Sequence, residues 1–186
     1  MKKRIFALLA AVAVMGAAHA EGPYIGVGIA SADHATSIGG ATGVSGDGYK
    51  ASGKLFGGVE MDKMWGVEAG YTDFRSAHYN YRVGAVPGTA SSDGHALYLA
   101  GKASAALNDN FSVFGKLGVE QTKTTLNASI AGLSRSDSKT GVYAGIGGQY
   151  NLSKQVALTL EYERYGKSRD FGAKADVFTV GARYSF

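Results

Sequence analysis

The last ten residues, 177–186, read VFTVGARYSF and alternate between an apolar face and a mixed face. Counting back in twos from the end of the chain gives the apolar set Phe186, Tyr184, Ala182, Val180 and Phe178. Successive side chains of a strand point to opposite faces, so the pattern predicts a strand with one apolar face. At an open sheet edge such a strand would pair with other chains, whereas a closed barrel has no edge. The pattern therefore favours a barrel over a buried sandwich strand.

The first 20 residues predict export. Residues 1–4 are basic after Met1, residues 5–14 form an uncharged apolar run, and Ala18–His19–Ala20 matches an A-x-A cleavage site. The apolar run is too short to cross a bilayer as a helix, which needs about 20 residues. We expect a signal peptide at residues 1–20 and one domain at residues 21–186.

The charge balance and the cysteine count exclude several classes of function. Without the signal peptide, which holds Lys2, Lys3 and Arg4, the chain's 19 basic residues fall to 16 against 15 acidic residues. A balance this close to neutral predicts no nucleic-acid partner. The absence of cysteine excludes a disulfide scaffold and cysteine chemistry.

Eight runs of alternating polarity follow the signal peptide. They cover about 22–31, 48–59, 64–74, 97–104, 111–120, 142–150, 156–163 and 177–186. Short turns at 60–63, 107–110 and 151–154 alternate with longer connections at 32–46, 75–92, 123–138 and 167–172. An even number of strands, each long enough to span the apolar layer at about 9–11 residues, is typical of outer-membrane barrels. We predict an all-β, eight-stranded, antiparallel, up-and-down transmembrane barrel.

One face of these runs is almost free of charge and has aromatic residues at its two ends. Trp65, Phe111 and Tyr150 lie on the turn side, and Tyr71 and Tyr162 lie towards the longer connections. A soluble barrel of the lipocalin kind also alternates, but its apolar face lines an internal pocket. Charges on one face and aromatics at the strand ends favour the membrane barrel. We expect it in the bacterial outer membrane, with membrane lipids and lipopolysaccharide around it.

The opposite face carries charged residues, Lys54 among them. Eight strands leave an interior that side chains fill, and an isolated buried charge is costly, so these charges must pair. We predict a lumen network that closes the barrel instead of conducting ions, formed by Glu68, Lys102, Lys116, Glu120, Glu161 and Arg183.

Four segments resemble the N-terminal barrel domain of the OmpA family and the small barrels of the OmpX/Ail type. They are WGVEAGYTDF at 65–74, YAGIGGQYNLS at 143–153, LTLEY at 158–162 and the terminal GARYSF. The resemblance implies inward acids at Glu68 and Glu161 and inward bases at Lys102 and Lys116. Gln149 and Thr159 stand where the family has an acid and an arginine, which argues against its gated-pore mechanism here.

The final strand resembles the C-terminal signature of outer-membrane barrels. The resemblance implies that Phe178, Val180, Ala182, Tyr184 and Phe186 form an assembly signal. The expected partner of this signal is the barrel assembly machinery.

No motif for a cofactor, a metal or a phosphate group is complete, so we expect no cofactor. Of the three histidines beyond the signal peptide, His34 and His78 lie in connections. The third, His95, lies beside Ser92 and Asp93, but these three residues are too close in sequence to set up a catalytic triad unaided.

We predict a non-enzymatic protein of envelope integrity whose surface loops contact a host ligand. Tyr79, Tyr81 and Arg82 are the candidate contact residues, because aromatics and arginine dominate binding hot spots. A tyrosine-rich rim of the barrel wall is the structural alternative for them. The alternative functions are a lipid A-modifying enzyme and a small low-conductance porin.

Overall fold

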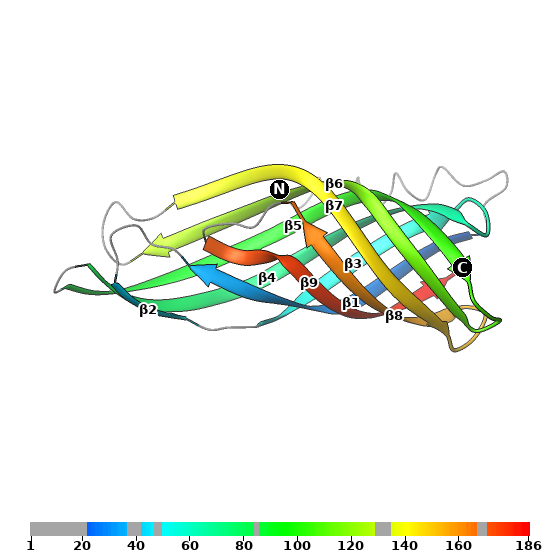
Figure 1. The fold of residues 1–186 in the computed structure, drawn as a ribbon, viewed down its shortest axis with the longest axis horizontal. Helices are drawn as coiled ribbons and strands as arrows, with labels where there is room; N and C mark the ends of the chain where they lie inside the picture. The colour runs from blue at the N-terminus through cyan, green and yellow to red at the C-terminus, as the bar shows by residue number, and fades with distance from the viewer. Residues whose placement is uncertain (1–21, 37–41, 47–49, 84–85, 129–134, 167–170) are drawn as a thin grey trace.

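The computed structural model describes residues 22–36, 42–46, 50–83, 86–128, 135–166 and 171–186, and strands make up nearly all of them (Figure 1). The strands are β1 (Gly22–Thr36), β2 (Thr42–Gly46), β3 (Lys50–Glu60), β4 (Trp65–Val83), β5 (Val86–Ala106), β6 (Phe111–Ala128), β7 (Arg135–Asn151), β8 (Val156–Tyr165) and β9 (Phe171–Ser185). The described ranges contain no helix of the length and hydropathy needed to cross a membrane.

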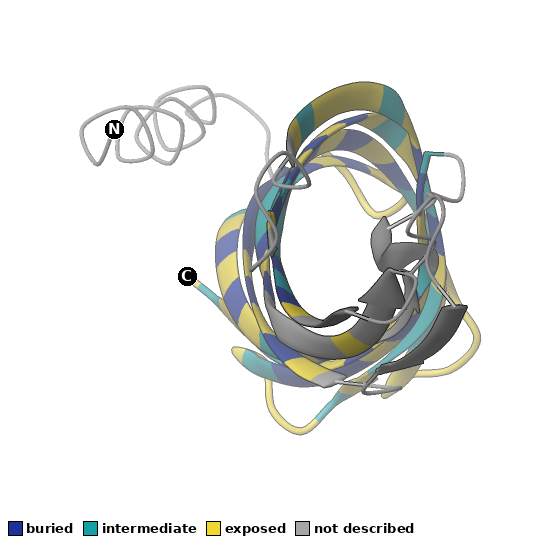
Figure 2. Cartoon of the chain, turned by 90° about the vertical axis from the view of Figure 1, so that its left-hand side faces the viewer, coloured by how far each residue is buried: buried dark blue, intermediate teal, exposed yellow. Residues whose placement is uncertain are grey.

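Eight of the strands close into a ring. Each strand from β3 to β9 pairs antiparallel with the next, and β1 pairs with both β3 and β9. The closing register places Val27 opposite Ala182. The remaining strand, β2, pairs only with the far part of β4 and is not one of the eight strands of the ring. The end-on view in Figure 2 shows the closed ring, and the predicted eight-stranded antiparallel barrel is confirmed.

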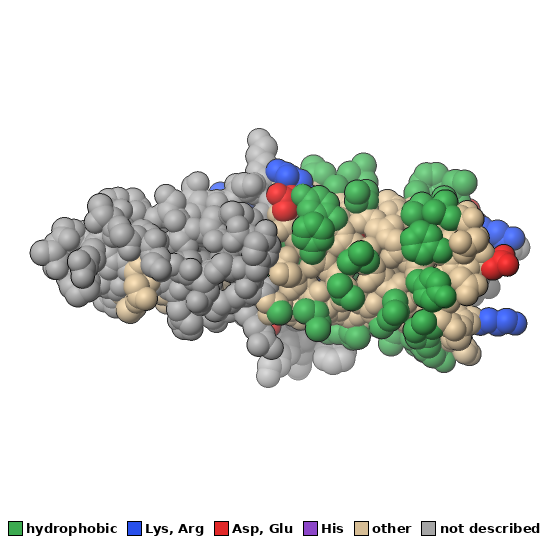
Figure 3. Space-filling view, turned by 60° about the horizontal axis from the view of Figure 1, so that its bottom comes forward, with side chains coloured by type: hydrophobic (Ala, Val, Ile, Leu, Met, Phe, Trp, Pro, Cys, Tyr) green, Lys and Arg blue, Asp and Glu red, His purple; other side chains and the backbone are tan. Residues whose placement is uncertain are grey.

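The outer face of the barrel is apolar. Exposed aliphatic and aromatic residues occupy alternate positions along the described parts of the eight ring strands, as Ile146 at 66 % exposure and Val180 at 61 % illustrate. Figure 3 shows these side chains as a band with charged side chains near its ends. The apolar set of the last strand also lies on this face, with Phe178, Val180, Tyr184 and Phe186 exposed and Ala182 half-buried. This band is the surface that the sequence predicts for contact with lipid.

Three short turns close one end of the barrel, called the turn end below; the opposite end is called the loop end. In the first turn, Asp62 Oδ1 accepts hydrogen bonds from the backbone N–H groups of Met64 and Trp65 at 2.8 and 2.7 Å. Asn108 and Ser153 accept equivalent bonds in the other two turns. The two N–H groups lower the pKa of the Asp62 carboxyl below its ordinary value. One polar side chain thus fixes each turn.

Several strands run further than the sequence predicts. The expected connection at 75–92 is mostly strand, since β4 extends to Val83 and β5 begins at Val86. The expected connections at 32–46 and 123–138 are shortened in the same way, and Glu60, expected in a turn, is the last residue of β3. Beyond the apolar layer, water can contact both faces of a strand, so the alternation of polarity that marks a strand is lost.

Candidate functional site

Charged side chains fill the barrel interior in two layers. The middle layer consists of Lys54, Glu68, Lys116, Glu161 and Glu163, which lie on β3, β4, β6 and β8. All five point inward because inward positions alternate along each strand. None is more than 6 % exposed. Charges buried this deeply need partners of opposite sign, and they find them across the lumen.

The five residues of the middle layer form a chain of alternating charge. Lys116 Nζ lies 2.6 Å from Glu68 Oε1 and 2.7 Å from Glu161 Oε1. Lys54 Nζ lies 3.1 Å from Glu161 Oε2 and 2.6 Å from Glu163 Oε1. Each lysine therefore bridges two carboxylates, and the bridges join strands that are not neighbours in the sheet.

Hydroxyl groups stabilise the surplus carboxylate of the middle layer, which has three acids and two bases. Tyr24 donates to Glu68 at 2.8 Å, and Tyr98 also donates to Glu68. Tyr143 and Tyr165 donate to Glu163 Oε1 at 2.6 and 2.9 Å, and Thr179 donates to Glu163 Oε2 at 2.5 Å. The rings of Tyr98 and Tyr143 stack with their centroids 4.1 Å apart. Tyr98, Tyr143 and Tyr165 pack together and close the lumen on the loop-end side of the charges.

The second layer, called the turn-end cluster, consists of Glu60, Lys102 and Arg183. Arg183 binds Glu60 through two hydrogen bonds of 2.7 and 2.9 Å, and Lys102 Nζ donates to Glu60 Oε1 at 3.1 Å. The Arg183 guanidinium lies over the ring of Tyr24, 4.1 Å from its centroid. Because the Tyr24 hydroxyl reaches Glu68, this ring links the two layers.

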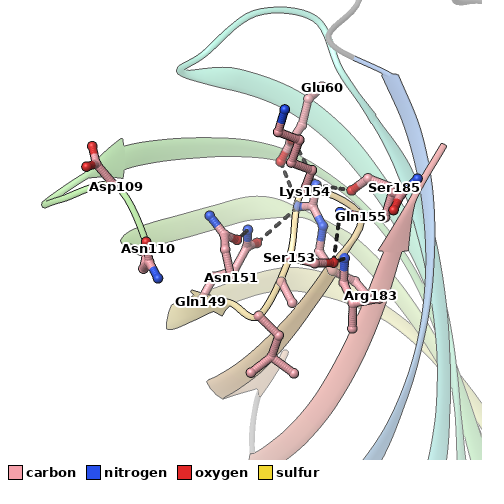
Figure 4. Close-up of a pocket in the computed structure, with 13 residues that line it drawn as sticks. Glu60, Asp109, Asn110, Gln149, Asn151, Ser153, Lys154, Gln155, Arg183 and Ser185 are labelled. Carbon is pink, nitrogen blue, oxygen red and sulfur yellow. Dashed lines mark hydrogen bonds and ion pairs between the residues drawn. The ribbon is translucent and has the colours of Figure 1, made fainter.

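A pocket of about 470 Å³ opens at the turn end next to this cluster (Figure 4). Its walls come from the turns at 107–110 and 152–155 and from the ends of β3, β7, β8 and β9. The polar lining residues include Glu60, Asn110, Gln149, Asn151, Lys154 and Arg183.

The six predicted network residues lie in three places. Glu68, Lys116 and Glu161 meet in the middle layer, and Lys102 and Arg183 meet in the turn-end cluster. Glu120 is buried but belongs to neither set, and it accepts a hydrogen bond from Thr122 at 2.5 Å.

Sequence reasoning left three charged partners out of the network. Lys54 and Glu163 stand at inward positions of the alternation, so the pattern contained their signal. Glu60 was assigned to a turn because three turn-like residues follow it.

The candidate contact residues Tyr79, Tyr81 and Arg82 lie in β4. Their backbone pairs with β5, where Tyr79 is opposite Ala90. Their side chains, like those of His34 and His78, lie outside the described residues. The structure therefore places their backbone in a paired strand instead of the loop that the sequence predicts.

The geometry around His95 does not suit a catalytic triad. Ser92 is buried on the inner side of β5, whereas His95 is three positions further along and therefore points to the opposite face. The His95 ring stacks on Tyr71, with centroids 5.8 Å apart. Among the described residues, no group of three or more His, Asp or Glu side chains is placed to hold a metal ion.

Comparisons with known proteins place the barrel in its context. A family model described as outer membrane protein beta-barrel domain matches residues 5–186. A search of curated proteins found no match.

Several solved structures share the fold. Ail, the attachment invasion locus protein of Yersinia pestis, solved with the heparin analogue sucrose octasulfate, is 22 % identical over 91 % of this chain and 100 % of its own, with a TM-score of 0.58. OprG of Pseudomonas aeruginosa is 16 % identical over 90 % of this chain and 97 % of its own, with a TM-score of 0.62. Neisserial surface protein A is 14 % identical over 91 % of this chain and 100 % of its own, with a TM-score of 0.54.

Proposed function

The chain belongs to the outer membrane protein β-barrel family, and from this membership we propose that it is a non-enzymatic protein of the bacterial outer membrane that supports the envelope and contacts external ligands. Residues 1–20 act as its signal peptide, and the apolar face of β9 is the part that the barrel assembly machinery binds. The short turns face the periplasm and the long hairpins face outward, as in other barrels of this class.

The charged interior is the observation that carries the structural role. Four carboxylates, on Glu60, Glu68, Glu161 and Glu163, meet four cations, on Lys54, Lys102, Lys116 and Arg183. This equal balance within the two layers, to which the buried Glu120 does not belong, supports, together with the tyrosines stacked above it, a plugged barrel that resists deformation and conducts few ions.

Planar-bilayer recording tests the plug. The purified protein is expected to give small and infrequent current steps. The comparison is a variant with Lys116→Ala and Glu161→Ala. It lacks two side chains of the middle layer and should conduct more than the unaltered protein. Large, steady steps from the unaltered protein would contradict the closed-lumen role.

The β4–β5 hairpin supports a role in surface contact. Its strands hold 19 and 21 residues, and at about 3.3 Å per residue they extend roughly 60–70 Å. A tilted strand needs only about 9–11 residues to cross the apolar layer. About half of the hairpin therefore stands beyond the membrane, and this half contains Tyr79, Tyr81 and Arg82. Because Ail was solved with a heparin analogue, we take sulfated polysaccharide as the ligand class to test.

Whole-cell binding to immobilised heparin tests this contact. Replacing Tyr79, Tyr81 and Arg82 together with Ala should lower binding and leave the heat-modifiable migration of the barrel intact. Lys63→Ala with Lys154→Ala removes basic residues from the turn end and is the control that should bind normally. Unchanged binding by the triple variant would remove the residue-level support for surface contact.

Lipid A analysis tests the non-enzymatic assignment. The acyl pattern of lipid A should be the same in cells that express the protein and in cells that lack it, because Ser92 and His95 lie on opposite faces of β5. A changed pattern would favour the enzyme.

A further inference from the structure

Each of the three short turns at the turn end has an exposed apolar residue at its first position. Met61, Leu107 and Leu152 each donate a backbone hydrogen bond of 2.9 Å to the carbonyl oxygen four residues further on. Their side chains are 49, 62 and 57 % exposed. Each lies an even number of positions beyond a lipid-facing residue of the preceding strand, and these reference residues are Leu55, Leu99 and Ile146. Because outward positions alternate along a strand, the three side chains continue the lipid-facing surface.

The turns themselves do not require these apolar side chains. In each turn the polar residue that follows, Asp62, Asn108 or Ser153, accepts the hydrogen bonds that fix the turn. Turn residues that face water are usually Gly, Pro, Asn, Asp or Ser. An apolar residue at the same position of three separate turns therefore indicates that this position contacts something other than water.

The height of the apolar surface identifies that surrounding as the bilayer. The apolar outward positions begin at Leu97 on β5 and at Val142 on β7, and Leu107 and Leu152 each stand ten positions further along. Ten positions span about 33 Å along a strand, which gives about 25 Å of height at a tilt of about 40°. The apolar band of an outer-membrane barrel is about 25 Å tall. A band that ended at Tyr150 would be about 5 Å too short.

We propose that the three turns are anchored in the periplasmic leaflet of the membrane, with Met61, Leu107 and Leu152 inserted at the boundary between the lipid headgroups and the acyl chains. The partner is phospholipid, because the three residues belong to three different hairpins and share only the outer circumference of the barrel. The inference rests on the proposed function, which places the barrel in the outer membrane with its short turns towards the periplasm. The anchors fix the depth of the barrel, since a shift along the membrane normal moves apolar surface into water at one end.

Depth-dependent fluorescence quenching tests the insertion. The chain contains no cysteine, so a single cysteine at a chosen position can carry the fluorophore NBD. Leu107→Cys and Leu152→Cys are each labelled and reconstituted in dioleoylphosphatidylcholine vesicles. Nitroxide-labelled lipid should quench both probes strongly, and iodide in the water should quench them weakly. Asp109→Cys and Lys154→Cys, two residues further on in the same turns, are the matched controls and should show the opposite order.

A probe at Ile146→Cys separates this inference from the proposed function, because Ile146 lies midway along the lipid-facing positions of β7. Lipid quenching at Ile146 but not at Leu107 and Leu152 overturns the anchoring and leaves the membrane barrel intact. The turns are then free to contact a periplasmic protein. Quenching of the Ile146 probe by iodide alone overturns both the anchoring and the membrane barrel.

Bilayer thickness gives a second test that needs no probe. Leu107→Asn with Leu152→Asn shortens the apolar surface of these two hairpins by about 5 Å. The urea midpoint of unfolding should fall in dioleoyl vesicles, whereas in thinner dilauroyl vesicles it should stay close to that of the unaltered protein. Asp109→Asn with Lys154→Asn leaves the apolar surface unchanged and should lower neither midpoint. An equal fall of the midpoint in both bilayers for the leucine variant contradicts the anchoring.

Discussion

Lys54 Nζ lies 2.6 Å from Glu163 Oε1, although the two residues are 109 positions apart in the chain. Both side chains are fully buried. They stand on β3 and β8, which are separated in the sheet by β1 and β9, so the pair spans the lumen. Ion pairs of this kind cross-link the barrel wall from within, in addition to the hydrogen bonds between neighbouring strands.

Removing one partner of this pair should destabilise the barrel strongly. Lys54→Met would leave Glu161 and Glu163 buried without one of their two lysines. We expect the free energy of unfolding, measured by urea titration of the barrel refolded in lipid vesicles, to fall by about 3–5 kcal/mol. Lys63→Met, at an exposed turn position, should change it by less than about 0.5 kcal/mol.

Adding Glu163→Gln to Lys54→Met should restore part of the lost stability, because the unpaired charge is then removed. If the stability loss of the double variant instead equals the sum of the losses of the two single variants, the two residues act independently.

Glycine is required at Gly118 because two strands approach closely there. A Cβ at this position would lie 2.0 Å from the backbone oxygen of Leu99 and 2.5 Å from Ala100 Cα, so β5 and β6 would have to separate. Gly118→Ala should lower the free energy of unfolding by about 1–3 kcal/mol. Gly53, where a Cβ would meet nothing within 4 Å, is the matched control. Equal losses from both substitutions would contradict the packing explanation.

The cost of a charge on the outer face should depend on depth in the membrane. Ile146 is midway along the outward positions of β7, and Val142 is closer to the loop end. Arginine at the midplane costs about 2–4 kcal/mol and near an interface about 0–1 kcal/mol. Ile146→Arg should therefore destabilise the refolded barrel more than Val142→Arg. The reverse order would place the centre of the bilayer elsewhere on the barrel.

The stability that the Asp62 side chain gives to its turn should depend on pH, whereas the stability that Asn108 gives to the second turn should not. The Met64 and Trp65 N–H groups lower the pKa of Asp62 in the folded state, so its ionised form stabilises the fold above its unfolded pKa of about 3.9. This stabilisation is lost as the pH falls through the folded-state pKa. The stability difference between the unaltered protein and Asp62→Ala should therefore shrink from pH 7 to pH 2. The corresponding difference for Asn108→Ala should stay constant, since an amide does not titrate in this range.

Alternation of polarity was enough to predict the ring and the side to which most residues point. It assigned Lys116 and Glu161 to the interior and Tyr150 to lipid because a period of two fixes the face of a strand. It could not pair Lys54 with Glu163, since that contact depends on how the tilted strands are staggered around the barrel. No local pattern contains the stagger.

The strand extensions and the turn-end pocket also lay beyond sequence reasoning. In β4 beyond Phe74 both faces contain polar residues, so the predicted strand ended there, whereas pairing with β5 continues to Val83. The pocket brings together Asn110, Gln149 and Arg183 from three separate parts of the chain. Its existence follows from the closed ring and not from any motif.

The closing register of β1 on β9 has a consequence for the order of assembly events. Until these strands meet, Lys54 and Glu60 on β3 are separated from their partners on β8 and β9. A half-inserted open sheet would present these charges to hydrocarbon, which offers them no compensating groups. Insertion and closure must therefore proceed together, and the ion pairs act as a checkpoint against entry of an incomplete barrel. The emission of Trp65, the single tryptophan, and the appearance of the heat-modifiable form should rise with one rate constant.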